Sequence, residues 1–251
     1  MSVHLQAHGR GSRARSDLAR PRPAAGWKGV TLRLAGGAVA LWGVLALIGL
    51  AVTHLLLHAA SFRSDDLSAD KWFAAHRTGA LNVVTYIGTT MAQTTTVIGV
   101  TLVVVLLLRW RLGRWHESGI FVAVMAGELL IFLGVTVVIH EARPSVPRLD
   151  AAPPTSSFPS GHTAAALALY GGIAIMVLWI YGRRPVTAIV VGVLSIVPAY
   201  VAFSRLYRGM HYPTDVLSGA LLGGLWLLWV TRTLLQPAAA ARAARPRARR
   251  S

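Results

Sequence analysis

The sequence predicts an all-α fold: a polytopic membrane helix bundle with about six transmembrane helices. Of its 251 residues, 54% are hydrophobic and only 14% are charged, which is too apolar for an ordinary soluble domain. Several uncharged runs reach the roughly 20 residues needed to cross about 30 Å of hydrocarbon. Basic residues also concentrate in alternate connections between these runs, as in membrane proteins whose positive loops stay in the cytoplasm.

Six apolar runs define the expected spans. They cover residues 34–57, 78–108, 118–139, 164–182, 185–203 and 216–231. The second run is longer than one crossing requires, so we expect it to hold a crossing plus a shallow stretch at the membrane surface. The first is longer than a signal-peptide core and no small-residue cleavage pattern follows it, so we interpret it as a span. An even number of spans places both chain ends on one side.

The chain is expected to form one membrane domain, residues 29–235, between two basic tails. The tails, residues 1–28 and 236–251, are rich in Arg, Ala and Pro, and such composition predicts disorder. Their charge is expected to attract anionic lipid headgroups. The chain has no cysteine, which excludes disulfide and thiolate chemistry.

The distribution of charge favours a membrane partner over nucleic acid. The net charge is +16, and 18 of the 25 basic residues lie in the tails and in the connections on the same side as the tails. We therefore expect a multi-pass plasma-membrane protein with both termini in the cytoplasm. The other side is expected to carry an amphipathic interfacial helix around Asp65–Phe73, with Trp72 as its headgroup-level anchor.

Three polar clusters lie where apolar runs stop or start, and all fall on the expected extracytoplasmic side. They are Ala142-Arg143-Pro144, then Pro159-Ser160-Gly161-His162-Thr163, then Ser204-Arg205 with His211 and Asp215. Connections between spans need only be short and soluble. The concentration of Arg, His, Ser and Asp therefore indicates a site on that face.

The second cluster has the pattern of a helix start that binds an anion. Proline and a Ser-Gly pair precede an apolar run, and a helix start offers free N–H groups and the positive end of the dipole. Gly161 allows close approach, Ser160 adds a hydroxyl, and His162 stands within one turn. The structural alternative is a capped helix with an incidental histidine.

The third cluster has the spacing of a catalytic pair. His211 and Asp215 are four residues apart and share one helix face, so the carboxylate can accept an imidazole N–H and leave the other nitrogen free to attack. Arg143 and Arg205 could bind phosphoryl oxygens through their forked donors. The alternatives are an Asp that stabilises the helix dipole beside an unrelated His, and arginines that snorkel to the interface.

Together the three clusters resemble the three-part signature of the type 2 phosphatidic acid phosphatase family, which shares its site with vanadium haloperoxidases and bacterial acid phosphatases. The resemblance covers about residues 60–232. It implies a lipid phosphatase that needs no metal or other cofactor. It also implies a role for each residue: His211 as the nucleophile that forms a phosphohistidine, Asp215 as its orienting partner, His162 as the general acid, and Arg143, Ser160, Gly161 and Arg205 as phosphate ligands.

Two residues stand apart from this pattern. Thr136 occupies the position, seven residues before Arg143, where the family usually has a lysine, so one phosphate contact is weakened or supplied elsewhere. Glu128 lies in the middle of the third span, where an ionisable group is a functional candidate. We expect Glu128 to play a structural role, either protonated or bonded to a Ser or Thr of a neighbouring helix.

The sequence therefore predicts a membrane lipid phosphatase. The expected substrates are isoprenyl diphosphates such as undecaprenyl diphosphate, which we favour, and phosphatidic acid and phosphatidylglycerol phosphate. Membrane lipids are the expected partners, nucleic acid is not, and the sequence leaves the oligomeric state open. One alternative is a catalytically silent lipid-binding or scaffold protein, supported by Thr136. The other alternative is a small transporter or channel, although Glu128 is the only charge within the spans and no broken-helix pair is evident.

Overall fold

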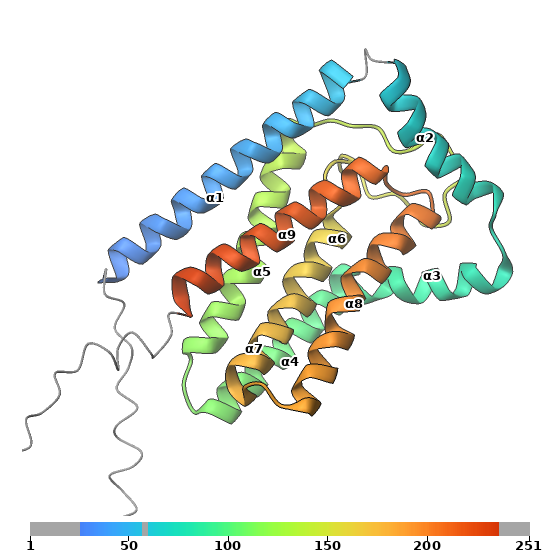
Figure 1. The fold of residues 1–251 in the computed structure, drawn as a ribbon. Coiled ribbons are helices and arrows are strands. Elements are labelled where there is room, and N and C mark those ends of the chain that lie inside the picture. Colours follow the sequence, from blue (N-terminus) through green and yellow to red (C-terminus); the bar gives the residue numbers. More distant parts are fainter. Residues whose placement is uncertain (1–25, 57–59, 236–251) are drawn as a thin grey trace, which may run out of the picture.

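The computed structural model describes residues 26–56 and 60–235, and this part of the chain is an all-helical bundle (Figure 1). Six of its helices are long and apolar enough to cross a membrane: Lys28–His54, Thr94–Leu112, His116–Val138, Gly161–Tyr181, Pro185–Tyr207 and Pro213–Leu234. The expected fold class, a polytopic helix bundle with about six spans, is confirmed.

The first span is α1 (Gly26–Leu50), which continues as the π-helical turns η1 (Ala51–Leu56). Because α1 begins at Gly26, the last residues assigned to the first tail belong to the helix. The predicted disorder of the tails concerns residues 1–25 and 236–251, which lie outside the described residues.

The second apolar run divides into two helices. α3 (Gly79–Met91) and α4 (Thr94–Leu112) are separated by Ala92 and Gln93, and only α4 has the length and composition of a span. The Oγ1 atom of Thr78 fixes the start of α3 by accepting the Leu81 N–H at 3.2 Å, which satisfies one of the donors that every helix start leaves open.

The predicted amphipathic segment is helical, as α2 (Ala60–Ala75). Its Trp72 is 57% exposed, whereas Asp70 is completely buried. The burial follows from packing, because the Asp66 carboxylate of α2 accepts the Thr214 N–H and hydroxyl at the start of the last helix. This helix is therefore docked on the bundle, and its place at the membrane surface stays a prediction.

The remaining helices are α5 (His116–Val138), the continuous segment α6 (Gly161–Ala166), η2 (Leu167–Gly171) and α7 (Gly172–Tyr181), then α8 (Pro185–Tyr207) and α9 (Pro213–Leu234). Both α8 and α9 begin with proline, whose missing N–H costs nothing at the first helical position.

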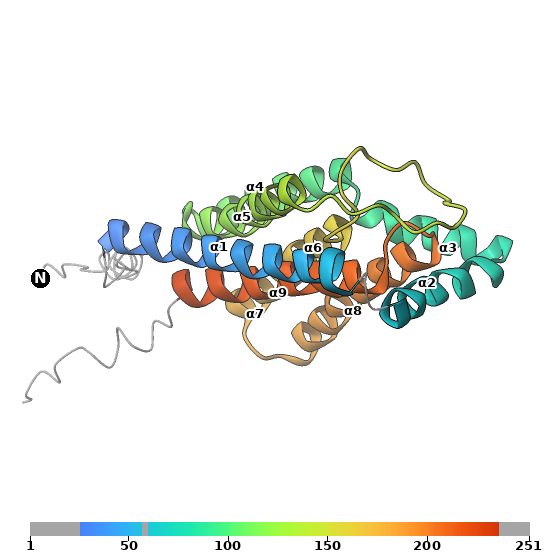
Figure 2. The same ribbon diagram turned by 90° about the horizontal axis from the view of Figure 1, so that it is seen from above.

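The start of the first span and the end of the last lie at the opposite end of the bundle from the polar clusters. α1 packs against α9, and both figures show the start of α1 and the end of α9 at one end (Figures 1 and 2). The other end carries two irregular connections, residues 139–160 and 208–212. A backbone bond from Leu149 N to Arg208 O, at 3.1 Å, ties the two together. Which end faces the cytoplasm stays a prediction.

Candidate active site

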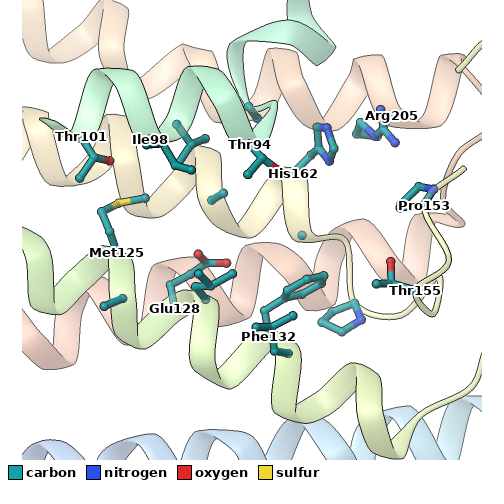
Figure 3. A pocket seen from close by; sticks show the side chains of 18 of the residues that line it. Thr94, Ile98, Thr101, Met125, Glu128, Phe132, Pro153, Thr155, His162 and Arg205 are labelled. Carbon is teal, nitrogen blue, oxygen red and sulfur yellow. The ribbon is translucent and has the colours of Figure 1, made fainter. Parts of the chain in front are cut away.

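A pocket of about 500 Å³ opens beneath these two connections (Figure 3). Its walls come from α4, α5, the 139–160 connection, the start of α6, the end of α8, and the turn before α9. The structure brings five of the seven predicted site residues into the lining of this one pocket: Arg143, Gly161, His162, Arg205 and His211. Residues far apart in the sequence thus meet at one place.

Hydrogen bonds define the tautomer of His211, which is 3% exposed. Its Nδ1 atom lies 2.9 Å from the carbonyl oxygen of Ser157. A carbonyl can only accept, so Nδ1 carries the proton and Nε2 keeps a lone pair. The Nε2 atom lies 3.4 Å from Nη1 of Arg143. The nitrogen able to attack a substrate is therefore the one beside an arginine of the pocket.

Asp215 supports His211 less directly than the spacing predicts. Its Oδ2 atom accepts the Ser157 hydroxyl at 2.5 Å and the Tyr212 N–H at 3.0 Å, and it lies 3.5 Å from Nδ1 of His211. The hydrogen bond from the imidazole Nδ1–H is accepted instead by the Ser157 carbonyl, which no sequence pattern singled out. Asp215 thus anchors the segment that holds the imidazole and supplies negative charge beside it.

Burial lowers the pKa of His211 to about 4. Asp215 opposes the shift through its carboxylate, whereas the positive charges of Arg205 and Arg143 add to it. At neutral pH the imidazole is consequently neutral, which is the form that a nucleophilic nitrogen requires.

The two predicted arginines are held by different partners. Nη1 of Arg143 donates to the Met210 carbonyl at 2.7 Å, which ties the first cluster to the His211 turn. Nη1 of Arg205 donates to the Asp150 carboxylate at 3.0 Å and to the Thr89 hydroxyl. Its Nε is buried without a partner among the described residues. Each arginine thus keeps donors beyond those that fix its position.

Asp150 is a site residue that sequence reasoning missed. Its carboxylate bridges Arg205 and Arg208, with Arg208 Nη2 at 2.6 Å and Nε at 2.8 Å. The only signal in the sequence is an acid, one of two with Glu141, in a connection that also carries Arg143 and Arg148. Nothing in the pattern indicated that it would pair with α8, because that contact depends on how the connection folds back.

The start of α6 is pressed against α9. The Ser160 N–H donates to the carbonyl of Asp215 at 2.9 Å, and a Cβ atom at Gly219 would lie only 2.3 Å from the Ser160 carbonyl oxygen. The missing side chain of Gly219 thus permits the close approach. The following N–H groups, from Gly161 onward, are the open donors of a helix start, and Gly161 and His162 line the pocket.

Ser160 and Thr136 lie differently from expectation. Ser160 is fully buried, with its Oγ 3.0 Å from Oγ1 of Thr163, and it is absent from the pocket lining. The Ser160 hydroxyl is directed to Thr163 of the same helix, because the Ser160 backbone packs closely against α9. Thr136 donates to the Leu133 carbonyl of its own helix at 2.9 Å and is also absent from the lining. Phosphate binding by the Ser160 hydroxyl stays a prediction.

The polar groups of the pocket suit an anion. Its charged or titratable lining residues are two arginines, two histidines and Glu128, and the nearby acid Asp150 is paired with arginines. Within residues 26–56 and 60–235, no three His, Cys, Asp or Glu side chains are grouped to hold a metal ion. The cationic groups gather at the end of the pocket beneath the two connections, whereas the rest of the lining is mostly apolar.

Comparison with known proteins supports the family resemblance seen in the sequence. The family model of the PAP2 superfamily matches residues 117–237, a range that includes all seven predicted site residues. The resemblance to the PAP2 superfamily is therefore confirmed over this part of the chain.

Three curated relatives resemble the chain over short stretches. They are phosphatidylglycerophosphatase B of Bacillus subtilis, 37% identical over 27% of this chain, lipid A 4'-phosphatase of Bacteroides thetaiotaomicron, 34% identical over 29%, and bacitracin transport permease protein BcrC of Bacillus licheniformis, 38% identical over 30%. The matched stretches span about a third of each relative's length (34%, 29% and 32%).

Two solved structures share the fold. The crystal structure of a transmembrane PAP2 type phosphatidylglycerolphosphate phosphatase from Bacillus subtilis matches with a TM-score of 0.68 at 23% identity, covering 84% of this chain and 98% of that one. Aquifex aeolicus LpxE matches with a TM-score of 0.52 at 19% identity, covering 68% and 94%. At these identities the matches establish the common architecture.

Proposed function

We infer that this protein is a membrane lipid phosphatase that releases phosphate from a lipid headgroup through a phosphohistidine on His211. The observation that carries the proposal is the fixed tautomer of His211: a protonated Nδ1 on the Ser157 carbonyl and an unprotonated Nε2 beside Arg143. The match to the PAP2 superfamily and the relatives named as phosphatases support the same activity.

The reaction proceeds in two steps. Nε2 of His211 attacks phosphorus, a P–N bond forms, and the bond from phosphorus to the lipid oxygen breaks as His162 gives that oxygen a proton. Arg143, Arg205 and the N–H groups at the start of α6 stabilise the charge on the phosphoryl oxygens. Water then attacks phosphorus, His162 takes its proton, the P–N bond breaks, and inorganic phosphate leaves. No step requires a metal.

The pocket supports a lipid as substrate. Its cationic end lies at one end of the bundle, and its apolar part runs between α4 and α5, two helices with the character of membrane spans. Phosphatidic acid, phosphatidylglycerol phosphate and isoprenyl diphosphates each have a phosphate for the first part and hydrocarbon for the second. With both termini cytoplasmic, as the charge distribution predicts, the phosphate would be cleaved at the extracytoplasmic face of the plasma membrane.

Phosphate release by purified protein tests the proposal. In detergent with EDTA, the wild type is expected to hydrolyse at least one of these lipids, and His211→Ala to lose at least about 1,000-fold, the scale on which a covalent nucleophile acts. His116→Ala is the matched control, because that histidine starts α5 at the other end of the bundle. Unchanged turnover in His211→Ala would remove this residue from the mechanism.

The rival function is a silent lipid-binding or scaffold protein of the same fold. The position of Thr136 favours it, since this hydroxyl bonds within α5 and supplies no charge where the family usually has lysine. A wild-type protein that binds all three lipids and releases phosphate from none would establish that function.

A further inference from the structure

Glu128 is a buried carboxyl group that the mechanism does not use. It lies in the middle of α5, is 3% exposed and lines the pocket. The expected hydrogen bond to a Ser or Thr of a neighbouring helix is not formed: within the described part of the chain, Glu128 has neither a hydrogen-bond nor an ion-pair partner. Figure 3 shows its carboxyl group directed from α5 into the cavity.

An unpartnered carboxyl at this depth has a cost that the fold must tolerate. Burying a polar group without a hydrogen-bond partner is destabilising, because its hydration is lost and nothing replaces it. The lining of this part of the pocket is mostly apolar, with Ile98, Met125 and Leu129 among its residues. In such surroundings the neutral acid is the less costly form, and a neutral carboxyl both donates and accepts a hydrogen bond.

Thr101 is a second polar group in the same part of the pocket. It lines the pocket from α4, and its Oγ1 is buried without a hydrogen-bond partner among the described residues. Figure 3 places it farther than Glu128 from the His162 end, beside Met125. A threonine in a helix commonly satisfies its hydroxyl on a backbone carbonyl one turn earlier, but Thr101 does not.

Glu128 lies deeper in the pocket than the start of α6, where the phosphate is proposed to bind. A Cβ atom at Gly161 would lie 2.8 Å from the Phe132 ring, so this ring lies against the start of α6. Glu128 precedes Phe132 by four residues on the same face of α5, which places it about 6 Å deeper along the helix axis. An extended chain of atoms covers about 3.8 Å in three bonds. A lipid atom five bonds from phosphorus therefore reaches the depth of Glu128.

Lipid phosphates differ in what they place five bonds from phosphorus. In a diacylglycerol phosphate this is an ester carbonyl, a hydrogen-bond acceptor that otherwise enters hydrocarbon unsatisfied. An isoprenyl phosphate has only carbon and hydrogen beyond its phosphate oxygens. A site built to hydrogen-bond a substrate group discriminates strongly against an analogue that lacks it, because its own buried group is then left unpaired.

We propose that Glu128, with Thr101 beyond it, binds an ester carbonyl of the lipid and makes the site selective for glycerol-based lipid phosphates over isoprenyl phosphates. The assignment rests on the proposed phosphatase function and narrows the substrate classes named for it. It reverses the preference for isoprenyl diphosphates drawn from the sequence.

The test compares phosphatidic acid with its ether-linked analogue, which lacks the carbonyls, and with farnesyl diphosphate. For the wild type, kcat/KM is expected to be about tenfold lower for the ether lipid, as one buried hydrogen bond of about 1.4 kcal/mol requires. In Glu128→Leu, kcat/KM for the ester lipid is expected to fall to the value for the ether lipid. For farnesyl diphosphate, kcat/KM is expected to change less than twofold. Glu128→Gln, which keeps a donor and an acceptor, retains the discrimination, and Met125→Leu is the matched apolar control.

Two results would overturn the assignment. One is equal kcat/KM for ester and ether lipids in the wild type, a comparison that needs no folded variant. The other is a Glu128→Leu variant in which both lipids lose activity equally, as a purely structural role requires. Binding of the two lipids by His211→Ala protein gives a readout without turnover, with about tenfold tighter binding of the ester expected. A wild type that binds the ester more tightly yet releases no phosphate would contradict the phosphatase function alone.

Discussion

The two sides of the pocket are built differently. In the most apolar stretch of α9, 50% of residues are buried inside the bundle, and α6 to α7 reaches 44%, whereas α4 reaches only 6%. The α6–α9 side carries the His211 turn and the start of α6, locked by backbone bonds and by Gly219. The α4 side exposes large side chains such as Leu102 and Leu106. In the proposed function, phosphate chemistry would take place on the packed side, and the lipid tail would contact the α4 side.

The largest expected difference in activity is between glycine substitutions on the two sides of the pocket. Gly219→Ala adds a Cβ atom 2.3 Å from a backbone oxygen, and a backbone atom cannot move aside as a side chain can. Overpacking of this kind costs about 1–3 kcal/mol or more. We expect at least about 100-fold less activity and a lower melting temperature. Gly99→Ala on α4 meets nothing within 4 Å and should change activity less than twofold. Equal tolerance of both changes, measured by phosphate release and thermal unfolding, would contradict the comparison.

Loss of the Asp150 carboxylate should have the next largest effect. Asp150→Asn removes the charge that holds Arg205 and Arg208, whose side chains are 3% and 6% exposed, and an uncompensated buried charge is costly. We expect about a 10- to 100-fold loss of kcat/KM. Glu117→Gln is the control, because it breaks the ion pair with Arg114 at the opposite end of the bundle. Similar losses in the two variants would show a general effect on stability rather than on the site.

The pH dependence follows from the lowered pKa of His211, about 4 in the folded protein against 6.5 in an unfolded chain. Between pH 6.5 and pH 4, His211 is protonated in the unfolded chain but stays neutral in the folded protein. The free energy of unfolding therefore decreases as the pH falls through this range, by roughly 3 kcal/mol in all. Above pH 6.5 this effect is absent. NMR titration of labelled histidines tests this, with the His211 signal identified by its absence from the His211→Ala spectrum. The titration midpoint of His211 should lie near pH 4. A midpoint at 6.5 would contradict the buried, neutral imidazole.

The smallest effect is expected at Thr136. Because its hydroxyl bonds to the Leu133 carbonyl within α5, Thr136→Val should change kcat/KM less than about threefold. A tenfold loss would mean that this hydroxyl reaches the phosphate, as the family's lysine position implied. Steady-state kinetics with phosphatidic acid is a sufficient measurement.

Sequence reasoning recovered what depends on local pattern. Apolar runs gave the fold class because a span needs about 20 apolar residues wherever it lies. The break between α3 and α4 was expected only as a surplus of length. Pocket residues were found where their chemistry is unusual at the edge of a span, as with Arg205 and His211. Contacts made by backbone or by folded connections, such as Ser157 to His211, leave no such pattern.

Glu128 shows the limit of local reasoning more clearly. A buried acid in the middle of a span was expected to be protonated or bonded to a Ser or Thr of a neighbouring helix. Only the arrangement of α4, α5 and α6 shows that its carboxyl group lines a cavity. Likewise, Ser160 has the residue type of a phosphate ligand, yet its hydroxyl is turned to Thr163 by the packing of α6 on α9.

The central claim is that Nε2 of His211 attacks phosphorus. Trapping the intermediate tests it most directly: wild-type protein is mixed with a lipid substrate labelled in its terminal phosphate, quenched within milliseconds in alkali, digested and mapped by mass spectrometry. The account predicts a phosphoryl group on His211, absent in His211→Ala protein. Labelling of a different residue, or rapid turnover with no phosphorylated protein at any time, would contradict it.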